Sequence, residues 1–362
     1  MNTHRYNRQI ILPEFGENSQ QKLLKSKVLV IGAGGLGCPV LQFLATAGVG
    51  HIGIADDDKV DISNLHRQIL YNENSIGKIK ANEAKEKLHQ INSEIEITAY
   101  SYKITHDNIL PLIEQYDIIV DGTDNFQIRY LLNDACKLLK KPLVHGAIYQ
   151  YEGQVSVFNI EKNGQITNYR DLFPVAPKSF EFPNCNQSGV LGTLSGIIGT
   201  VQANEVIKLI TGIGDLLVHK LYLINVLNYE TRIIKYNKLE IVMGPKNKEE
   251  FLTMNYDTFC NISSFSKKEI ANKEELRSLL ARENSILIDV RNEGEIPVIN
   301  KYEYIRIPLT ELSHRLEELE NYTTIIFVCQ SGVRSEQAFK LVQQKYPQKD
   351  IFHIYKGVKT IL

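Results

Sequence analysis

A glycine-rich turn is the first place where this sequence could do chemistry. The apolar run 28–31 leads into Gly32-Ala33-Gly34-Gly35-Leu36-Gly37, a G-x-G-x-x-G pattern that precedes an expected helix. Glycines let the backbone approach a phosphate, and the helix N-terminus behind them offers free N–H groups. Asp56 stands 19 residues after Gly37, at the end of the next expected strand, where a carboxylate can bind ribose hydroxyls. These residues predict a nucleotide site, although the turn alone suits NAD at least as well as ATP.

The charged residues after that second strand favour phosphate chemistry over hydride transfer. They stand in three runs, Asp56-Asp57-Asp58, Asp61-Ile62-Ser63-Asn64-Leu65-His66-Arg67-Gln68 and Gly77-Lys78-Ile79-Lys80. Arginine and lysine can meet the charge of a triphosphate, while a carboxylate such as Asp124 can hold Mg²⁺. An NAD-dependent Rossmann oxidoreductase would leave Arg67 and Lys80 idle, so it is kept as the alternative of another class.

A second place for chemistry lies at Cys329, late in the chain. The apolar run 325–328 leads into Cys329-Gln330-Ser331-Gly332-Val333-Arg334-Ser335, which opens an expected helix. Such a loop can turn backbone N–H groups toward the sulfur, and Arg334 with the helix N-terminus would stabilise a thiolate or persulfide. The five-residue step from Cys329 to Arg334 is one short of the step that phosphatases use, which favours sulfur transfer.

Alternating strands and helices would position both places. Expected strands are 27–31, 51–55, 94–100, 117–121 and 142–147, and helix-like periodicity occupies 39–47, 80–91, 107–115 and 126–139. This alternation predicts an α/β fold with a Rossmann-like doubly wound sheet. A second βα series from 286 to 354 predicts a small α/β domain behind it.

Length, charge and cysteine usage narrow the class of protein. A chain of 362 residues exceeds one usual core, so we expect a domain at 1–240, a linker at 241–267 and a domain at 268–362. The net charge of −1 argues against a protein that coats nucleic acid or a membrane. The absence of a secretory signal predicts a cytoplasmic location. The five cysteines form no C-x-x-C pair, which gives no sign of a local zinc site.

Several motifs in order resemble one known family. They are Arg5-Tyr6-Asn7-Arg8-Gln9, the glycine turn, 56–68, 77–81, Asp121-Gly122-Thr123-Asp124-Asn125 and 188–192. Over roughly residues 4–236 the sequence is similar to the MoeB and ThiF adenylyltransferases of molybdopterin and thiamine synthesis, which are related to ubiquitin-activating enzymes. The Cys329 loop and Asp289-Val290-Arg291 resemble rhodanese domains, over about residues 268–358.

The resemblance implies an ATP-dependent enzyme that adenylylates the C-terminal glycine carboxylate of a ubiquitin-like sulfur-carrier protein and releases pyrophosphate. Cys329 and Arg334 would then pass sulfur to the carrier, which ends as a thiocarboxylate. The molybdopterin-synthase small subunit is the expected carrier, and the thiamine-pathway carrier is the alternative. A cysteine desulfurase or thiosulfate would supply the sulfur.

The resemblance also assigns residues. Those that would contact ATP are Gly32, Gly34, Gly35, Gly37, Asp56, Asp58, Asn64, Arg67, Lys80 and Asp124. Asp124 would bind Mg²⁺, and Arg8 would reach the triphosphate across a homodimer interface. Relatives bind zinc through two C-x-x-C pairs, but here Asn168-Tyr169-Arg170-Asp171 replaces the first pair and no pair occurs near 238–245. Zinc is therefore not expected, and packing must order these two segments.

The remaining thiols and histidines leave alternatives open. Cys185 precedes Ser188 and a glycine-rich helix, whose positive end would lower the pKa of the thiol. In the family a cysteine at this position can attack the adenylate or link to the carrier, whereas an inert loop cysteine is the other interpretation. A rhodanese-like domain with a purely structural role is the alternative for Cys329. For His66 and His145, which have no partner evident from sequence, we favour structural roles.

Two further alternative functions each leave part of the chain unexplained. A relative that adenylates an RNA base would not need a rhodanese-like domain, and a scaffold that only docks carrier proteins would not need the triphosphate residues. Both therefore explain less of the chain than an adenylyltransferase with a sulfur-handling domain.

Overall fold

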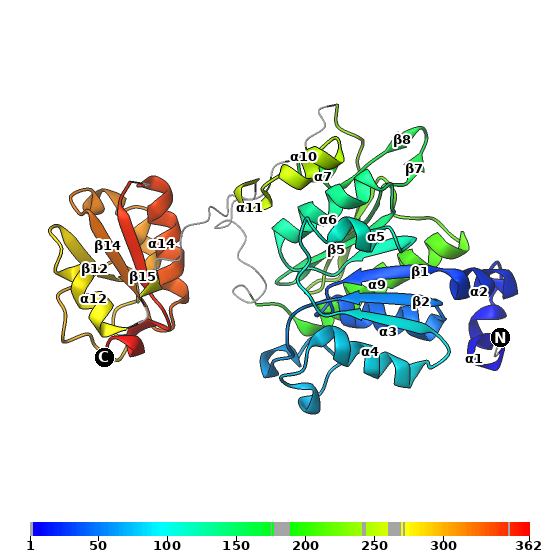
Figure 1. Cartoon of the computed structure of the whole chain (residues 1–362), viewed down its shortest axis with the longest axis horizontal. Coiled ribbons are helices and arrows are strands. Elements are labelled where there is room, and N and C mark those ends of the chain that lie inside the picture. Colours follow the sequence, from blue (N-terminus) through cyan, green and yellow to red (C-terminus); the bar gives the residue numbers. More distant parts are fainter. Residues whose placement is uncertain are drawn as a thin grey trace. The chain divides into compact units, whose positions relative to one another are not determined.

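The computed structural model describes residues 3–174, 176, 189–240, 244–259, 269–270, 272–346 and 348–362. The described residues form two compact units, one that holds those up to Phe259 and one that begins at Glu269 (Figure 1). Within these ranges, no helix is both long enough and apolar enough to cross a membrane.

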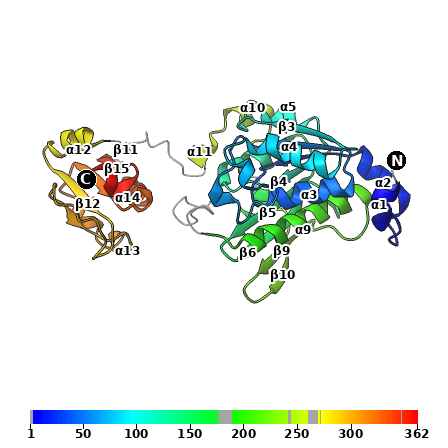
Figure 2. The same cartoon turned by 90° about the horizontal axis from the view of Figure 1, so that it is seen from below.

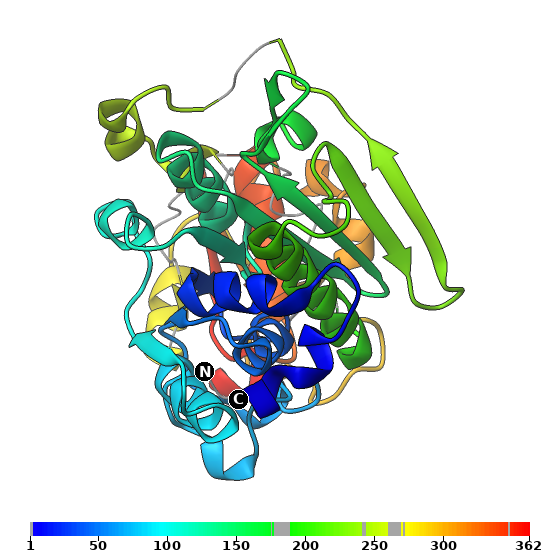
Figure 3. The same ribbon diagram turned by 90° about the vertical axis from the view of Figure 1, so that its right-hand side faces the viewer.

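A single sheet of eight strands runs through the described part of the first unit, in the order β10-β9-β6-β5-β4-β1-β2-β3. The strands are β1 Lys27–Ile31, β2 His51–Ala55, β3 Glu96–Tyr100, β4 Ile118–Asp121, β5 Leu143–Tyr149, β6 Glu152–Phe158, β9 Lys220–Asn225 and β10 Glu230–Lys235. Strands β1 to β5 pair in parallel with one another, whereas the β5–β6, β6–β9 and β9–β10 pairs are antiparallel. Figure 3 shows the β9–β10 hairpin at the edge of this sheet. The predicted doubly wound α/β fold is confirmed.

Helices cover both faces of the sheet. They are α1 Thr3–Ile10, α2 Gly16–Lys25, α3 Gly37–Ala47, α4 Lys80–Ile91, α5 Ile109–Ile113, α6 Phe126–Leu138, α7 Tyr169–Leu172, α9 Gly192–Thr211, α10 Lys248–Thr253 and α11 Tyr256–Phe259. The described residues of this unit also form short 3-10 turns, η1 Ile62–Asn64 and η2 Glu73–Ser75, and a small hairpin of β7 Glu161–Lys162 and β8 Gln165–Ile166.

The sequence of β1 explains why two helical layers form. Val28 and Val30 belong to a core cluster with residues of α3 and α9, whereas Leu29 and Ile31 belong to a cluster with residues of α5 and α6. Successive side chains of a strand point to opposite faces, so a continuous apolar run needs cover on both. Figure 2 shows α9 and α10 on opposite sides of the sheet.

Part of the predicted linker belongs to the first unit. Residues 244–259 include α10 and α11, which pack against α6. Phe251 is fully buried, and Tyr256 is 7% exposed, in the same core cluster as α6. These two aromatic side chains anchor the stretch to the helices that cover the sheet. The short, polar pattern of its sequence did not indicate this packing.

The second unit has a five-stranded sheet over its described residues, in the order β11-β15-β14-β12-β13, with all neighbours parallel. Its elements are β11 Glu269–Ile270, α12 Lys273–Leu280, β12 Ser285–Asp289, β13 Ile305–Arg306, α13 Leu309–Leu312, η3 Leu316–Leu319, β14 Thr324–Val328, α14 Val333–Lys345, β15 Asp350–Ile354 and η4 Gly357–Thr360. Every residue of the central strand β14 is buried, and its side chains alternate between two core clusters. Cys329 follows this strand directly.

Candidate active sites

The glycine turn closes tightly between β1, β4 and α3. Gly32 has a φ of +94°, and a Cβ there would lie 2.6 Å from the carbonyl oxygen of Gly122, just after β4. A Cβ at Gly37 would lie 1.9 Å from the carbonyl oxygen of Gly32. Only glycine fits at these two positions, and the result is a compact backbone turn at the N-terminus of α3, where a phosphate can be bound.

Asp56 is fixed against this turn. Its Oδ2 accepts a hydrogen bond from the Ala33 N–H at 2.8 Å, and its Oδ1 accepts one from the Asp58 N–H at 2.9 Å. Burial raises the pKa of Asp56 above its usual value, although the charge of Lys80 acts in the opposite direction. Lys80 begins α4, and its Nζ donates to Asp58 Oδ2 at 2.9 Å, with side chains 7% and 72% exposed respectively. The structure thus places Asp56, Asp58 and Lys80 together, as the sequence predicted for an ATP site.

The short turn η1 carries Asn64 and leads to Arg67. Asp61 accepts a hydrogen bond from the Ser63 N–H at 2.8 Å, and Asn64 Oδ1 accepts one from the Asp61 N–H at 3.2 Å, which closes the turn as a capping box. The Arg67 side chain donates to the Ser63 carbonyl at 3.2 Å. These local bonds fix the backbone from which Arg67 extends.

Helix α9 holds that segment next to the glycine turn. A Cβ at Gly192, the first residue of α9, would lie 2.3 Å from the His66 carbonyl oxygen. On the turn itself, a Cβ at Gly35 would lie 3.0 Å from Ser195 Oγ and 3.4 Å from Arg67 Cγ. The close backbone packing at Gly192 therefore brings the stem of Arg67 over the turn.

A buried polar network supports the loop that carries Asp124. Asp121 is fully buried, and its Oδ1 accepts hydrogen bonds from the N–H and hydroxyl of Thr123 at 3.0 and 2.6 Å. Its Oδ2 lies 2.8 Å from His145 Nδ1 and 3.3 Å from Arg129 Nε. Burial acts to raise the pKa of Asp121, but the His145 hydrogen bond and the Arg129 charge hold the pKa below its usual value. The side chain of Asp124 is exposed and makes no hydrogen bond or ion pair with another described residue.

Sequence reasoning missed this network because it gave His145 no partner. The partner is Asp121, which lies opposite His145 in the parallel pairing of β4 and β5. Burial lowers the pKa of His145 below its usual value, although the hydrogen bond with Asp121 acts to raise it. A histidine within one apolar strand and an aspartate at the end of another were the available signal, but the strand register was needed to join them.

Arg8 is not brought to the glycine turn of its own chain. It lies on α1, which packs where α3 and α4 end, because the Tyr6 hydroxyl accepts a hydrogen bond from Asn92 Nδ2 at 2.9 Å and the Tyr6 ring contacts Gly48. The glycine turn is at the other end of α3, about 16 Å away for a helix of this length. Arg8 is exposed, without a hydrogen bond or ion pair to the rest of the described chain.

In the second unit the Cys329 thiol lies fully buried at the base of a loop between β14 and α14. Its Sγ accepts the Gly332 N–H at 3.2 Å and lies 3.5 Å from Ser335 Oγ. Gly332 has a φ of +94°, and a Cβ at Gly357 would lie 2.5 Å from the Cys329 carbonyl oxygen. The loop is therefore clamped by glycines, with a backbone N–H directed at the sulfur.

Arg334 begins the helix behind this loop and forms a bidentate ion pair with Glu295. Its NH1 and NH2 donate to Glu295 Oε1 and Oε2, both at 2.6 Å. These hydrogen bonds lower the pKa of Glu295 to about 2. They also raise the pKa of Arg334, to which the charge of the Cys329 thiolate contributes further. The charges of the Cys329 sulfur and Arg334 can thus interact, as the sequence predicted. The Arg334 guanidinium is, however, already paired with Glu295.

Of the other four cysteines, the structure describes two, and both are buried. Cys185 and its neighbour Ser188 lie outside the described residues, as does Cys260. Cys38 and Cys136 are fully buried. Burial raises the pKa of Cys38 to about 12 and that of Cys136 well above its usual value, which favours inert thiols.

The two segments in which the resemblance to MoeB and ThiF proteins implies zinc ligands are joined here by other contacts. Asp171 Oδ1 accepts a hydrogen bond from the Leu239 N–H at 2.9 Å, and a Cβ at Gly244 would lie 2.5 Å from Arg170 Nε. Arg170 donates to both oxygens of Asp134, from Nε at 2.8 Å and from NH2 at 2.7 Å. The residues at 168–171 offer no thiolate, and no group of three metal-ligating side chains occurs in the described ranges. The side chains of residues 168–171 therefore do not fit zinc. We call the contacts of Arg170 and Asp171 the polar clasp.

Comparison with known proteins places both sites in a family context. The model of the ThiF family matches residues 6–240, and that of the rhodanese-like domain matches residues 272–361. "Adenylyltransferase and sulfurtransferase MOCS3" of Culex quinquefasciatus is 37% identical over 368 residues, which is 96% of this chain and 83% of that protein. "Probable adenylyltransferase/sulfurtransferase MoeZ" of Mycobacterium tuberculosis is 38% identical over 363 residues, which is 98% of this chain and 91% of that protein.

Solved structures agree at the level of the fold. The crystal structure of E. coli MccB superposes with a TM-score of 0.57 at 23% sequence identity, over 66% of this chain and 71% of that one. The resemblance to MoeB and ThiF proteins, and to rhodanese domains, is confirmed. The chain belongs to the ThiF family and carries a rhodanese-like domain behind its ThiF domain.

Proposed function

We propose that this protein uses ATP to adenylylate the C-terminal glycine carboxylate of a ubiquitin-like sulfur carrier, and then transfers sulfur to it. The observation that carries this proposal is the likeness to relatives named adenylyltransferase and sulfurtransferase along nearly the whole chain, through both domains in order. We assign the ATP chemistry to residues 1–240 and the sulfur chemistry to 268–362. An NAD-dependent oxidoreductase would explain only the glycine turn.

The roles at the first site follow from where its residues lie. The turn of Gly32, Gly34, Gly35 and Gly37 would receive phosphate oxygens at the N-terminus of α3. Asp56, held against the turn, is placed to bind ribose hydroxyls. Lys80 is held by Asp58, whose carboxylate is 72% exposed and can move aside when a triphosphate arrives. Asn64 and Arg67 would also contact ATP. They belong to the segment that packs between α9 and the glycine turn.

The reaction needs no protein nucleophile. An oxygen of the carrier's carboxylate attacks the α-phosphorus of ATP, a new C–O–P linkage forms, and the bond to the β-phosphate oxygen breaks as pyrophosphate leaves. The obstacle is repulsion between two anions, so the chain's task is to place them together and offset their charge. Lys80 and Arg67 do this from the same chain. Arg8 does so from a partner subunit in a homodimer, since its own glycine turn lies at the far end of α3.

Magnesium would be held by Asp124. Mg²⁺ is usually bound through one or two carboxylates together with substrate phosphates, and the exposed Asp124 carboxylate fits that requirement. When bound, the ion neutralises phosphate charge. The buried network of Asp121, Thr123, Arg129 and His145 fixes the backbone from which Asp124 extends.

In the second step Cys329 carries the sulfur. Its thiolate takes a sulfane sulfur from a donor to give a persulfide, and the outer sulfur then attacks the carrier's activated carbonyl while AMP leaves. A thiol reductant cleaves the resulting S–S bond and releases the thiocarboxylate. We propose Arg334 as a positioning residue for this loop, and Cys185 as a candidate for a covalent link to the carrier. A reducing compartment would keep the Cys329 thiol free to accept sulfur, so we propose a cytoplasmic location.

Pyrophosphate exchange tests the first step. ATP should incorporate labelled pyrophosphate only when a carrier is present, and assays with the molybdopterin-synthase small subunit and the thiamine-pathway carrier identify the partner. We propose the molybdopterin carrier, since the rhodanese fusion favours that pathway. Asp124→Ala should abolish exchange, whereas the exposed control Asp107→Ala should not. Normal exchange in a folded Asp124→Ala protein would contradict the proposal.

Loss of sulfur transfer without loss of exchange tests the second step. Cys329→Ser should keep carrier-dependent pyrophosphate exchange, because adenylylation involves no thiol. The same variant should form no persulfide and no carrier thiocarboxylate, both of which mass spectrometry detects. Sulfurtransferase activity that survives in Cys329→Ser would refute the assigned role.

A further inference from the structure

The loop around the Cys329 thiol has a single cation, and that cation is already paired. Gln330 and Ser331, the two residues after the cysteine, are uncharged, and Arg334 is the one basic residue between 329 and 335. Both of its terminal nitrogens bond Glu295, at 2.6 Å each. A bidentate guanidinium–carboxylate pair is charge-assisted and geometrically specific, so it is not given up easily to a third group.

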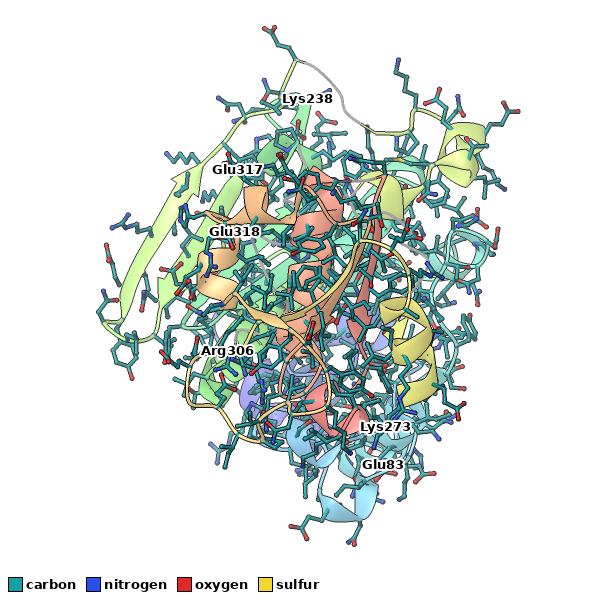
Figure 4. All side chains as sticks on the ribbon, turned by 90° about the vertical axis from the view of Figure 1, so that its left-hand side faces the viewer. Glu83, Lys238, Lys273, Arg306, Glu317 and Glu318 are labelled. Atoms are coloured by element: carbon teal, nitrogen blue, oxygen red, sulfur yellow. The ribbon has the colours of Figure 1, made fainter. Side chains whose placement is uncertain are left out.

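Two other arginines of this unit, Arg291 and Arg306, are also bound to a carboxylate. Arg291 is fully buried and donates to both oxygens of Asp289 at 2.8 Å, while Arg306, labelled in Figure 4, donates to Asp289 Oδ2 at 3.2 Å. Arg291 NH1 also bonds the Pro297 carbonyl at 2.9 Å and Gln330 Oε1 at 3.3 Å. These bonds tie the segment 295–298 to the loop. The guanidinium groups of Arg291, Arg306 and Arg334 therefore all have a carboxylate partner.

One lysine lies close to the loop on its other side. The backbone nitrogen of Lys356 would be 3.0 Å from a Cβ at Gly332. The Lys356 ammonium lies 5.3 Å from the centre of the Tyr355 ring. Lys356 is thus a further cation near this loop that could attract an anion, and it therefore belongs in any test.

Four exposed apolar side chains lie in the loop or in the segments next to it. Ile296 and Val298, on the segment that Arg291 ties to Gln330, are 76% and 51% exposed, and Val333 and Tyr355 are 44% and 46% exposed. Exposed apolar side chains around a fully buried thiol suit contact with a protein surface better than capture of a small hydrated anion.

We propose that Glu295 is a specificity-determining residue of the sulfurtransferase site. By holding Arg334 in a bidentate ion pair, it disfavours free anionic sulfur donors such as thiosulfate and favours persulfide sulfur presented on a donor protein. This inference rests on the proposed role of Cys329 as the sulfur acceptor. Glu295 acts through Arg334 and touches no reacting atom.

The same bond changes occur with either class of donor. The Cys329 thiolate attacks the sulfane sulfur, a new S–S bond forms to Cys329, and the donor's S–S bond breaks. The leaving group takes the electron pair, as sulfite from thiosulfate or as a thiolate from a protein persulfide. The donors differ in charge: thiosulfate brings two negative charges to a loop whose arginine is already neutralised.

Two small donors of different charge test the proposal. Thiosulfate is a dianion and methanethiosulfonate a monoanion, and both transfer a sulfane sulfur with cyanide as the final acceptor. Glu295→Gln removes the charge but keeps an acceptor for Arg334 and for the Asn292 N–H, which Glu295 now binds at 2.9 Å. The KM for thiosulfate should fall at least about tenfold, with kcat changed less than about twofold and a smaller fall for the monoanion.

Controls separate charge from structure. Glu293→Gln alters an exposed neighbouring glutamate and should leave both KM values unchanged, and Glu295→Asp should keep the wild-type preference. An unchanged KM ratio in a folded Glu295→Gln protein would overturn the inference. So would efficient thiosulfate use by the wild type that is lost in Lys356→Gln, because an unpaired cation would then already serve the anion. A Cys329 that accepts sulfur from no donor would instead refute the proposed function itself.

Discussion

The polar clasp of Arg170 and Asp171 leads to a prediction about the stability of the first unit. Arg170 and Asp134 are 2% and 1% exposed, and the guanidinium lies over the rings of Tyr130 at 4.8 Å and Phe259 at 4.4 Å. Replacing Arg170 by methionine keeps much of the apolar stem but leaves the Asp134 carboxylate without its cation. Removing one partner of a buried ion pair typically costs about 3–5 kcal/mol.

The structure places the expected cost at the lower end of that range. Asp134 keeps hydrogen bonds from the Tyr256 hydroxyl at 2.9 Å and from Asn133 Nδ2 at 3.0 Å, so its charge is partly solvated after the change. A loss of ~3 kcal/mol, at 2–4 °C per kcal/mol for a unit of this size, lowers the melting temperature of the first unit by roughly 6–12 °C. Arg170→Met should therefore show a large shift.

Thermal unfolding measured by calorimetry tests this expectation. ATP identifies the transition of the first unit, because a ligand that binds the native state raises that transition. The matched control is Arg232→Met, since Arg232 forms an exposed pair with Glu230 and such changes usually stay within about 0.5 kcal/mol. EDTA should leave the transition in place. A shift in Arg170→Met no larger than in the control, or a comparable fall caused by EDTA, would refute the reasoning.

Two further predictions concern the glycine turn and pH. In Gly37→Ala the new methyl group would lie 1.9 Å from the Gly32 carbonyl oxygen, so the turn must shift. Calorimetric titration should show that ATP affinity falls at least about tenfold, and the free energy of unfolding should fall by ~1–3 kcal/mol. The control Gly196→Ala, which has open space around its Cβ, should bind ATP normally. Burial holds the pKa of His145 below 6.5, so below that pH the unfolded chain binds a proton that the native chain does not. Between pH 6.5 and the native pKa, the free energy of unfolding of the wild type should therefore fall by up to ~1.4 kcal/mol per pH unit more than that of His145→Gln. Parallel denaturant titrations measure both. An equal dependence on pH in the two proteins would contradict the lowered pKa of His145.

The local sequence pattern was sufficient to predict the strand, turn and carboxylate that form the first site. The strand 27–31, the turn at Gly32 and the carboxylate of Asp56 are consecutive features whose placement depends on short-range periodicity, and the structure has them as expected. The third strand begins at Glu96, two residues later than predicted from 94–100. Ends of elements depend on hydrogen bonds to neighbouring strands, which composition does not reveal.

Contacts between distant segments could not be predicted in the same way. The pairing of Asp121 with His145 depends on the register between two strands, and that of Arg334 with Glu295 depends on an irregular segment that carries no periodicity. The burial of Phe251 within a stretch expected to be a linker has the same cause. Each is a contact between segments distant in the chain, and periodicity within one segment does not reveal the partner in another.

The two sites share one construction and differ in how their cations are held. In each, a buried parallel strand ends at a turn with a glycine at φ +94°, Gly32 or Gly332, and a helix follows. At the first site the acid that holds Lys80 is 72% exposed and forms a single ion pair, so a triphosphate can displace it. At the second, Glu295 is 28% exposed and grips Arg334 with two bonds, so a free anion gains little by competing. The same turn therefore suits a polyanionic nucleotide in one domain and protein-borne sulfur in the other.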